Sequence, residues 1–81
     1  MVETRLSEKA VQTAVEAVRR YDDYKKRADY IRDRFTNEEA GYWGCFIKHA
    51  DDKAAVGFYY NVGIRINVRV GDSDIKLWKN A

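Results

Sequence analysis

The spacing of apolar residues changes once along this chain, at Gly41, and this change limits the folds open to it. Before Gly41, apolar residues recur every three or four positions, as on one side of a helix. After Gly41 they alternate with polar residues, as in a strand that buries one face. Because the helices precede all the strands, we expect an α+β fold in which two N-terminal helices pack on an antiparallel β-sheet.

The segment before residue 21 predicts an amphipathic helix at about residues 7–20. Ser7 is expected to cap its first turn, and Arg19 and Arg20 suit the negative end of its dipole. Thr13 and most of the charged side chains fall on the polar side of this helix. The expected buried side consists of Ala10, Val11, Ala14, Val15, Ala17 and Val18.

A second helix is expected at about residues 23–36, with Asp22 or Asp23 as its N-terminal cap. The apolar residues of this segment follow one another at helical intervals of four, three and four positions. They are Tyr24, Ala28, Ile31 and Phe35. The basic residues between them are expected at the helix surface rather than in a phosphate site: Lys25, Lys26, Arg27, Arg32 and Arg34.

Four strands are expected after Gly41, at about residues 42–48, 55–61, 63–70 and 74–79. In the first of these strands, Trp43, Cys45 and Ile47 share one face. The clearest alternation is in the third strand, where four apolar residues point one way and three polar residues the other. These are Ile64, Ile66, Val68 and Val70 against Arg65, Asn67 and Arg69.

Two short helices can cover only one face of this sheet, yet its aromatic residues must be shared between both faces. The rings concerned are Tyr42, Phe46, Phe58, Tyr60 and Trp78. A monomer would expose some of them, and exposed apolar patches mark interaction surfaces. The expected second strand also carries no charge between Ala55 and Tyr60, so its edge is open to another strand. Both features predict a homodimer.

The composition describes one folded domain, residues 1–81, because 46% of the residues are hydrophobic and none is proline. The net charge of +2 does not demand a polyanionic partner, so no nucleic acid is expected. Cys45 is the only cysteine and cannot form an internal disulfide, which favours the reducing cytoplasm. No apolar run is long enough to insert into a membrane, and the first residues lack the apolar core of a signal peptide.

No group of residues in the sequence has the spacing of a catalytic or metal site. Cys45 and His49 suggest a nucleophile and a base, but a cysteine between two apolar residues on one strand face is typical of a buried, inert thiol. The short acidic clusters at residues 51–52 and 72–74 fit turns better than a metal site. Since there is also no phosphate-binding loop and no zinc spacing, we expect no enzyme, no catalytic residue and no metal.

Several runs of residues resemble one known family. The run Ala14-Val15-Glu16-Ala17-Val18-Arg19-Arg20-Tyr21 is followed by Lys25, Lys26, Ile31 and Phe35, and then by Trp43-Gly44-Cys45-Phe46-Ile47. Later come Val70-Gly71 and the ending Leu77-Trp78-Lys79-Asn80. From about Leu6 to Ala81, the chain is similar to the small cytoplasmic dynein light chains, which form domain-swapped dimers and bind peptides. One insertion lies in the loop at residues 49–56, and the loop near residues 61–63 is shorter.

The resemblance implies a non-catalytic, homodimeric protein-interaction module. In that family the second strand leaves its own subunit and pairs with the partner's sheet, and its free edge captures an extended peptide as an added strand. In this chain that strand would span about residues 55–62. The residues implied for peptide binding are Tyr24, Lys25, Val56, Phe58, Tyr59, Tyr60, Asn61, Arg65, Asn67 and Arg69. The residues implied for the dimer interface are Trp43, Gly44, Gly57, Phe58, Tyr60 and Asn80.

Two departures from the family's pattern affect the expected ligand and dimer. Arg65, Asn67 and Arg69 stand where the family lines its groove with aromatic residues, so a groove with two guanidinium groups should prefer acidic peptides. Gly44 stands where the family has an interface histidine, so mild acid should not split the dimer through that position. From the residues alone, Arg65 and Arg69 fit a solvated strand face equally well.

This divergence, with the start Thr4-Arg5-Leu6, also resembles the dynein-light-chain-like C-terminal domain of flatworm tegument calcium-binding proteins (tegumental allergen-like). That subfamily, which we favour slightly, implies a place in the tegument and calcium-binding EF-hands upstream. This chain has no EF-hand loop, so no cofactor is expected in it. One alternative is a free-standing motor light chain of the dynein complex, associated with microtubules and the cytoskeleton and partnered by the dynein intermediate chain. The other is a structural dimerisation domain without peptide clients.

Overall fold

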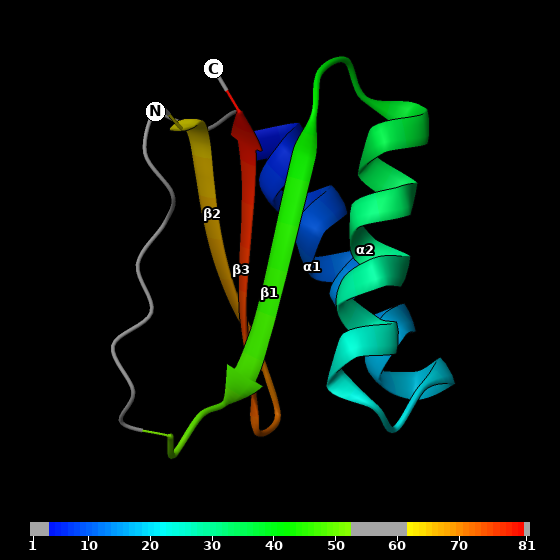
Figure 1. Ribbon diagram of the computed structural model, residues 1–81, viewed down its shortest axis with the longest axis vertical. Helices are drawn as coiled ribbons and strands as arrows, with labels where there is room; N and C mark the ends of the chain where they lie inside the picture. Colours follow the sequence, from blue (N-terminus) through cyan, green and yellow to red (C-terminus); the bar gives the residue numbers. More distant parts are fainter. Residues whose placement is uncertain (1–3, 53–61, 81) are drawn as a thin grey trace.

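The computed structural model describes residues 4–52 and 62–80, which form two helices followed by three strands (Figure 1). In chain order these elements are α1 Thr4–Arg20, α2 Tyr24–Glu38, β1 Trp43–His49, β2 Val62–Val70 and β3 Ser73–Asn80. The fold class is therefore α+β with an antiparallel sheet, as the change of period at Gly41 predicts. The expected strand at residues 55–61 lies outside the described residues.

The sheet has β3 at its centre, between β1 and β2. α2 packs mainly against β1 and α1 against β2, so both helices cover the same face of the sheet (Figure 1). The apolar side of each strand forms this face, and one row across it runs from Cys45 through Leu77 to Ile66. We call the opposite side, turned away from the helices, the outer face. As predicted, the polar residues of β2 are exposed there: Arg65, Asn67 and Arg69.

The first helix begins earlier than its sequence indicates. Ser7 lies inside α1 rather than at its cap, because Leu6 already belongs to the buried side of the helix. That buried side also differs from the expected one. Thr13 is buried, with its hydroxyl donating to the carbonyl oxygen of Lys9 at 2.7 Å, whereas Val11 is 47% exposed. A hydroxyl that bonds back to its own helix can enter the core without losing a hydrogen bond.

The second helix begins where predicted, with the carboxylate of Asp23 accepting a hydrogen bond from the N–H of Lys25 at 3.4 Å. The prediction that Arg27 lies at the helix surface is wrong, since the residue is only 8% exposed. Its guanidinium donates to the carbonyl oxygen of Tyr21 and, at 3.0 Å, to the hydroxyl of Ser73 at the start of β3. These bonds replace the lost hydration and fix α2 against the central strand.

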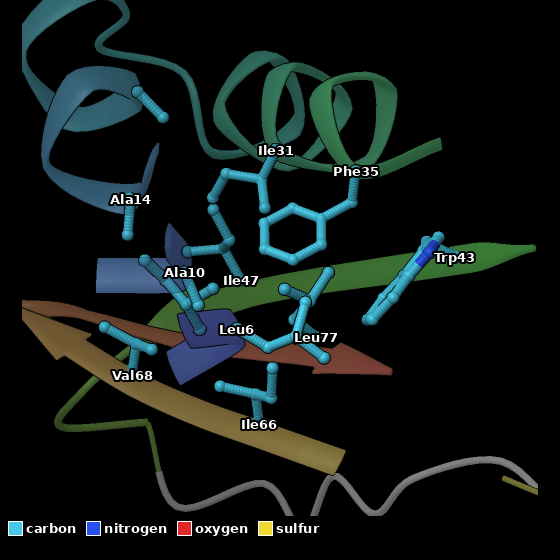
Figure 2. Packing of buried hydrophobic residues seen from close by; sticks show 12 residues of the cluster. Leu6, Ala10, Ala14, Ile31, Phe35, Trp43, Ile47, Ile66, Val68 and Leu77 are labelled. Atoms are coloured by element: carbon cyan, nitrogen blue, oxygen red, sulfur yellow. The ribbon is translucent and has the colours of Figure 1, made fainter. Parts of the chain in front are cut away.

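The hydrophobic core fills the space between the helices and the sheet (Figure 2). Ile31 and Phe35 project from α2 into this space and are fully buried. The ring of Phe35 lies 4.9 Å from that of Trp43, centroid to centroid, at an interplanar angle of 56°. This tilted contact is a favourable aromatic geometry, and it joins α2 to the first residue of β1. The other buried members are Leu6, Ala10, Ala14, Ala17, Ile47, Ile66, Val68, Ile75 and Leu77.

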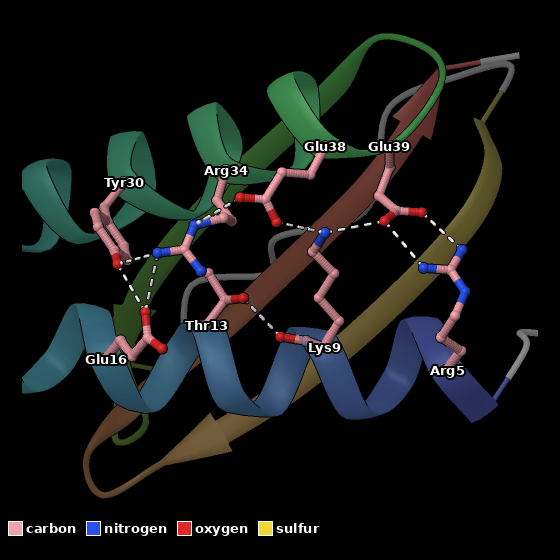
Figure 3. A network of polar contacts seen from close by, with 8 residues as sticks. All are labelled: Arg5, Lys9, Thr13, Glu16, Tyr30, Arg34, Glu38 and Glu39. Carbon is pink, nitrogen blue, oxygen red and sulfur yellow. Dashed lines mark hydrogen bonds and ion pairs between the residues drawn. The ribbon is translucent and has the colours of Figure 1, made fainter.

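Charged side chains join the two helices at the C-terminal end of α2 (Figure 3). Arg5 donates two hydrogen bonds to the carboxylate of Glu39, at 2.7 and 3.0 Å. Lys9 contacts the same carboxylate at 2.9 Å and that of Glu38 at 2.8 Å. The hydrogen bonds from Arg5 and Lys9 lower the pKa of Glu39 from 4.5 to about 2, because they stabilise the ionised carboxylate.

A second group of polar contacts joins the helices nearer the start of α2 (Figure 3). The hydroxyl of Tyr30 donates to the carboxylate of Glu16 at 2.7 Å, and Arg34 donates to the same carboxylate at 3.1 Å. The hydrogen bond from Tyr30 lowers the pKa of Glu16, and it raises the pKa of Tyr30 itself. Glu16 therefore stays ionised and holds both side chains of α2 against α1.

The lowered pKa of Glu39 predicts how stability depends on pH. The stabilising contribution of this carboxylate is fully present above about pH 4.5 and is lost as the pH falls toward 2. Glu39→Gln should therefore lower the free energy of unfolding at neutral pH, and its difference from the wild type should shrink as the pH falls below 4.5. Urea unfolding at a series of pH values measures this difference.

A matched variant separates the ion pairs from a general effect of the substitution. Arg5→Gln removes the first of the two donors, so the pKa of Glu39 should rise toward its ordinary value and the pH window should move up with it. Equal losses of stability at pH 7 and pH 2 in Glu39→Gln would show that the carboxylate charge has no part in holding the helices.

Candidate functional site

β1 is an edge strand of the described sheet. Its hydrogen bonds to β3 show which of its residues turn their backbone N–H and C=O groups away from the sheet. The N–H of Asn80 donates to the carbonyl oxygen of Tyr42, and the N–H of Ala50 to that of Asp72. In an antiparallel ladder every second residue bonds to a given neighbour, so Gly44, Phe46 and Lys48 also bond toward β3. The residues that turn their N–H and C=O groups away from β3 are Trp43, Cys45 and Ile47.

A groove of about 380 Å³ runs beside this edge of the described sheet, between β1 and α2. Ala28, with the smallest side chain of the helix wall, leaves room for an incoming side chain. The carboxylate of Asp29 lies 3.3 Å from the ammonium of Lys25 and 3.3 Å from the guanidinium of Arg32, and these three residues form a charged rim. The full lining is Tyr24, Lys25, Ala28, Asp29, Arg32, Cys45, Phe46 and Ile47. An apolar groove along the outermost strand of the described sheet suits an added strand.

Cys45 contributes to the wall of this groove. Burial raises the pKa of its thiol to about 12, so the thiol is protonated at neutral pH and lines the groove as a small apolar group. His49, its suggested partner, is engaged at the other end of β1. The ring lies 3.3 Å from the carboxylate of Asp72, and its Nδ1 accepts from the N–H of Asp51 at 3.1 Å.

The structure separates the residues expected to bind peptide into two sets. Tyr24 and Lys25 line the groove at the β1 edge. Arg65, Asn67 and Arg69 are exposed on β2, at the opposite edge of the sheet, so the single chain does not bring them to that groove. The remaining expected residues lie outside the described part of the chain: Val56, Phe58, Tyr59, Tyr60 and Asn61.

The residues expected at a dimer interface are also dispersed. Trp43 is 5% exposed and belongs to the core of the single chain, against Phe35. Gly44 lies opposite Trp78 in the register, and a Cβ there would stand 2.4 Å from the indole ring. Asn80 is exposed at the end of β3. Gly57, Phe58 and Tyr60 fall outside the described residues.

The rings assigned from sequence to the two faces of the sheet differ in exposure. Tyr42 is 80% exposed and Phe46 43% exposed, as expected for a face that the helices do not cover. Trp78, on the same outer face, is only 7% exposed. Among the described rings, the exposed ones are therefore Phe46 on β1 and Tyr42 immediately before it, on the strand at the edge of the described sheet.

Of the helix wall of the groove, the resemblance implied Tyr24 and Lys25, but sequence reasoning missed Ala28, Asp29 and Arg32. Tyr24, Ala28 and Arg32 follow one another at intervals of four, and Lys25 and Asp29 repeat the same interval. Residues four apart lie on one side of a helix, so this spacing could have indicated a mixed apolar and charged stripe. It could not indicate which strand lies beside that stripe, because the spacing of apolar residues does not determine the order of strands in the sheet.

Comparisons with known proteins leave the likeness to the dynein light chains as a prediction. No protein-family model matches the chain, and a search of curated proteins finds no matching relative. In residues 4–52 and 62–80, no cluster of three histidine, cysteine or acidic side chains is placed to hold a metal ion. None of the described helices is both long and apolar enough to cross a membrane.

The contact between Gly44 and Trp78 yields a test of the outer face. Gly44→Ala places a methyl group where the indole ring lies, and overpacking of this kind costs about 1–3 kcal/mol of the free energy of unfolding. The Nε1–H resonance of Trp78 should shift as the ring moves. In the double variant with Trp78→Leu, the cost of Gly44→Ala should largely disappear. Additive effects of the two substitutions would contradict the contact.

Proposed function

We propose that this chain is a homodimeric protein-interaction module of the dynein light chain type, which binds extended partner peptides by β-strand addition. The observation that carries the proposal is the edge of β1 that no described strand pairs, beside the groove of α2. Backbone groups of Trp43, Cys45 and Ile47 are positioned to pair with an incoming strand, and the groove can receive its side chains. The role is one of binding, without catalysis.

β1 is the better of the two sheet edges for an exchanged strand. β2 carries the charged side chains of Arg65 and Arg69, which protect a strand edge against pairing, and its register shifts between Val62 and Ile64. On β1, the charge of Lys48 is offset by Asp74 at 3.6 Å. β1 therefore accepts an uncharged strand, such as the one expected at residues 55–61, more readily than β2 does.

The length of β1 also matches the segment proposed to exchange. β1 spans seven residues, Trp43–His49, and the expected second strand spans seven, at about 55–61. In the proposed dimer this segment of one copy pairs with β1 of the other, and its second edge takes the peptide. Each backbone hydrogen bond contributes ~1 kcal/mol net, while ordering each peptide residue costs ~1–2 kcal/mol. Tight binding therefore depends on side-chain pockets and on two sites per dimer.

The setting of the module is part of the same proposal. The residues shared with the dynein light chains support a cytoplasmic, cytoskeleton-associated protein, either a free-standing motor light chain or the C-terminal domain of an EF-hand tegument protein. In the second case calcium binds upstream of this chain. A purely structural dimerisation domain is the other candidate, and it is favoured by the position of Arg65, Asn67 and Arg69, which lie away from the groove within one chain.

The mass in solution tests the exchange of strands. Light scattering should give a mass near twice 9.5 kDa. Ala28→Arg fills the groove from the helix side without touching the backbone of β1, so it should lower the mass toward that of one chain while the circular dichroism spectrum is retained. Val11→Arg, which adds the same side chain at an exposed position of α1, is the matched control and should remain a dimer.

Peptide binding separates the two candidate functions. With the peptide-binding module, a disordered acidic peptide should slow hydrogen exchange at the amides of residues 55–60, because those amides form the proposed receiving edge. A broad peptide array that yields no such protection, from a protein of twofold mass, would favour the structural dimerisation domain instead.

A further inference from the structure

The valines of α1 lie at the margin of the core rather than in it. The buried side of the helix consists of Leu6, Thr13 and three alanines. Val11 is 47% exposed, and Val15 and Val18 are only partly buried and lie outside the core cluster. Valine on a helix surface is unfavourable, because its branched Cβ lowers helix propensity and its methyl groups stay in water. Its use at these positions indicates a surface that another molecule covers.

The three valines share one side of α1, turned away from α2. Val11, Val15 and Val18 follow one another at intervals of four and three positions, which keeps them in line along a helix. Lys9 and Glu16 mark the side that faces α2 (Figure 3). Two positions, or about 200° around the helix, separate Lys9 from Val11 and Glu16 from Val18. We call Val11, Val15 and Val18 the valine stripe.

A shallow hollow lies at the start of the valine stripe. Its volume is about 310 Å³, and its lining is Ser7, Glu8, Val11 and Gln12. Ser7 and Val11 form one row of residues four apart, and Glu8 and Gln12 form the next. The groove between two such rows is the place where a side chain of a packed helix lies. The surface is therefore shaped to receive another helix.

Two charged residues stand beside the stripe, on the same flank of α1. Glu8 and Arg19 are both exposed, and neither forms an ion pair with another described residue. They are 11 positions apart in the sequence. That spacing corresponds to about three turns, so the two side chains project in nearly the same direction. Both charges are therefore available to a partner.

We propose that the valine stripe is a self-association surface, on which α1 of a second copy packs antiparallel. A twofold axis through the stripe sets Val11 of one copy beside Val15 of the other. The same axis sets Glu8 of each copy beside Arg19 of the other, so that two ion pairs form. A parallel pair would leave the two charges about 16 Å apart along the helix axis. The charges therefore select the antiparallel arrangement.

This surface goes beyond the proposed function and uses none of its elements. It lies on α1, whereas the proposed exchange uses the β1 edge and the groove of α2. One helix face buries less than the roughly 1,200 Å² of a stable interface, so the pairing is weak and forms at high protein concentration. Strand-exchanged dimers, which carry two copies of the stripe, would be joined by it into larger assemblies.

Charge disfavours the other occupants of the stripe. Helices that lie on anionic membranes carry lysine and arginine along the polar face, whereas here Glu8 offsets Arg19 on the flank of the stripe. A helix of another protein would need the same two charges in reversed order. A second copy supplies that order by symmetry.

The concentration dependence of the mass tests the surface. By analytical ultracentrifugation, the Ala28→Arg variant, proposed to be a single chain, should rise toward two chains between about 10 μM and about 1 mM. Adding Val11→Arg should weaken this association about tenfold or more, because a charged group enters the centre of the stripe. Asn37→Arg, at an exposed position of α2, is the matched control and should keep the association within about twofold.

The wild type separates this surface from the proposed strand exchange. Its mass should rise above two chains at high concentration, whereas Val11→Arg should stay at two. If the Ala28→Arg variant remains a dimer, the proposed use of the groove fails. The rise above two chains and its loss in Val11→Arg still test the valine stripe in that case.

Exchanging charges tests the antiparallel arrangement. Glu8→Arg and Arg19→Glu should each self-associate about fivefold more weakly, since each change brings like charges together twice. An equimolar mixture of the two variants should associate about as strongly as the wild type, because each copy then supplies the charge that the other lacks. Both positions are exposed, so both variants should fold.

Three results would overturn the self-association surface. The first is a mass that stays constant over the concentration range in the wild type and in Ala28→Arg. The second is association that persists in Val11→Arg, or a mixture of the two charge variants that associates no better than either alone. The third is sedimentation with phosphatidylserine vesicles that requires Val11, in a protein that does not self-associate, which would identify a lipid-binding helix.

Discussion

The backbone edge of β1, which no other described strand pairs, is the constraint on which the rest of this structure depends. Peptide groups that face away from a sheet need water or another strand, and an edge with a free ladder is open to pairing. Here those groups belong to Trp43, Cys45 and Ile47, whose side chains are turned toward the helices. The edge therefore offers apolar side chains on the face toward the helices and backbone hydrogen-bonding groups along its length. An added strand requires both.

The contacts between the helices and the sheet give this edge its groove. Arg27 bonds to Ser73, Phe35 packs on Trp43, and Glu16 holds Arg34 across the helix pair. Each contact fixes α2 at a different point, so the helix wall stands beside β1 before any strand arrives. A site that is formed in advance loses less conformational entropy on binding. The two edges of the described sheet then differ in charge, because Arg65 and Arg69 lie along β2, and β1 is the edge better suited to an uncharged strand from a second copy.

The sequence allowed the helices and the described strands to be predicted, but not which of them lie side by side in the fold. The change of period at Gly41, the cap at Asp23 and the alternation of β2 follow from local geometry, and all three are confirmed. Arg27 was misplaced because its burial depends on Ser73, a partner 46 residues away. Ala28, Asp29 and Arg32 were missed as groove residues for a similar reason, since no local pattern indicates that β1 lies beside α2 at an edge of the described sheet. The exchanged strand and the peptide site stay predictions that rest on residues 55–61, outside the described chain.

The central claim is that a strand from a second copy pairs with β1. Hydrogen exchange at the β1 amides that point away from β3, followed as the protein is diluted, tests this claim most directly. If a second copy supplies the missing strand, Cys45 and Ile47 exchange slowly where the protein is dimeric and rapidly once dilution separates the copies. Gly44 and Phe46, which bond toward β3, should stay protected throughout and serve as internal controls. Fast exchange of Cys45 and Ile47 at every concentration, or slow exchange that persists in a protein of single-chain mass, would contradict the account.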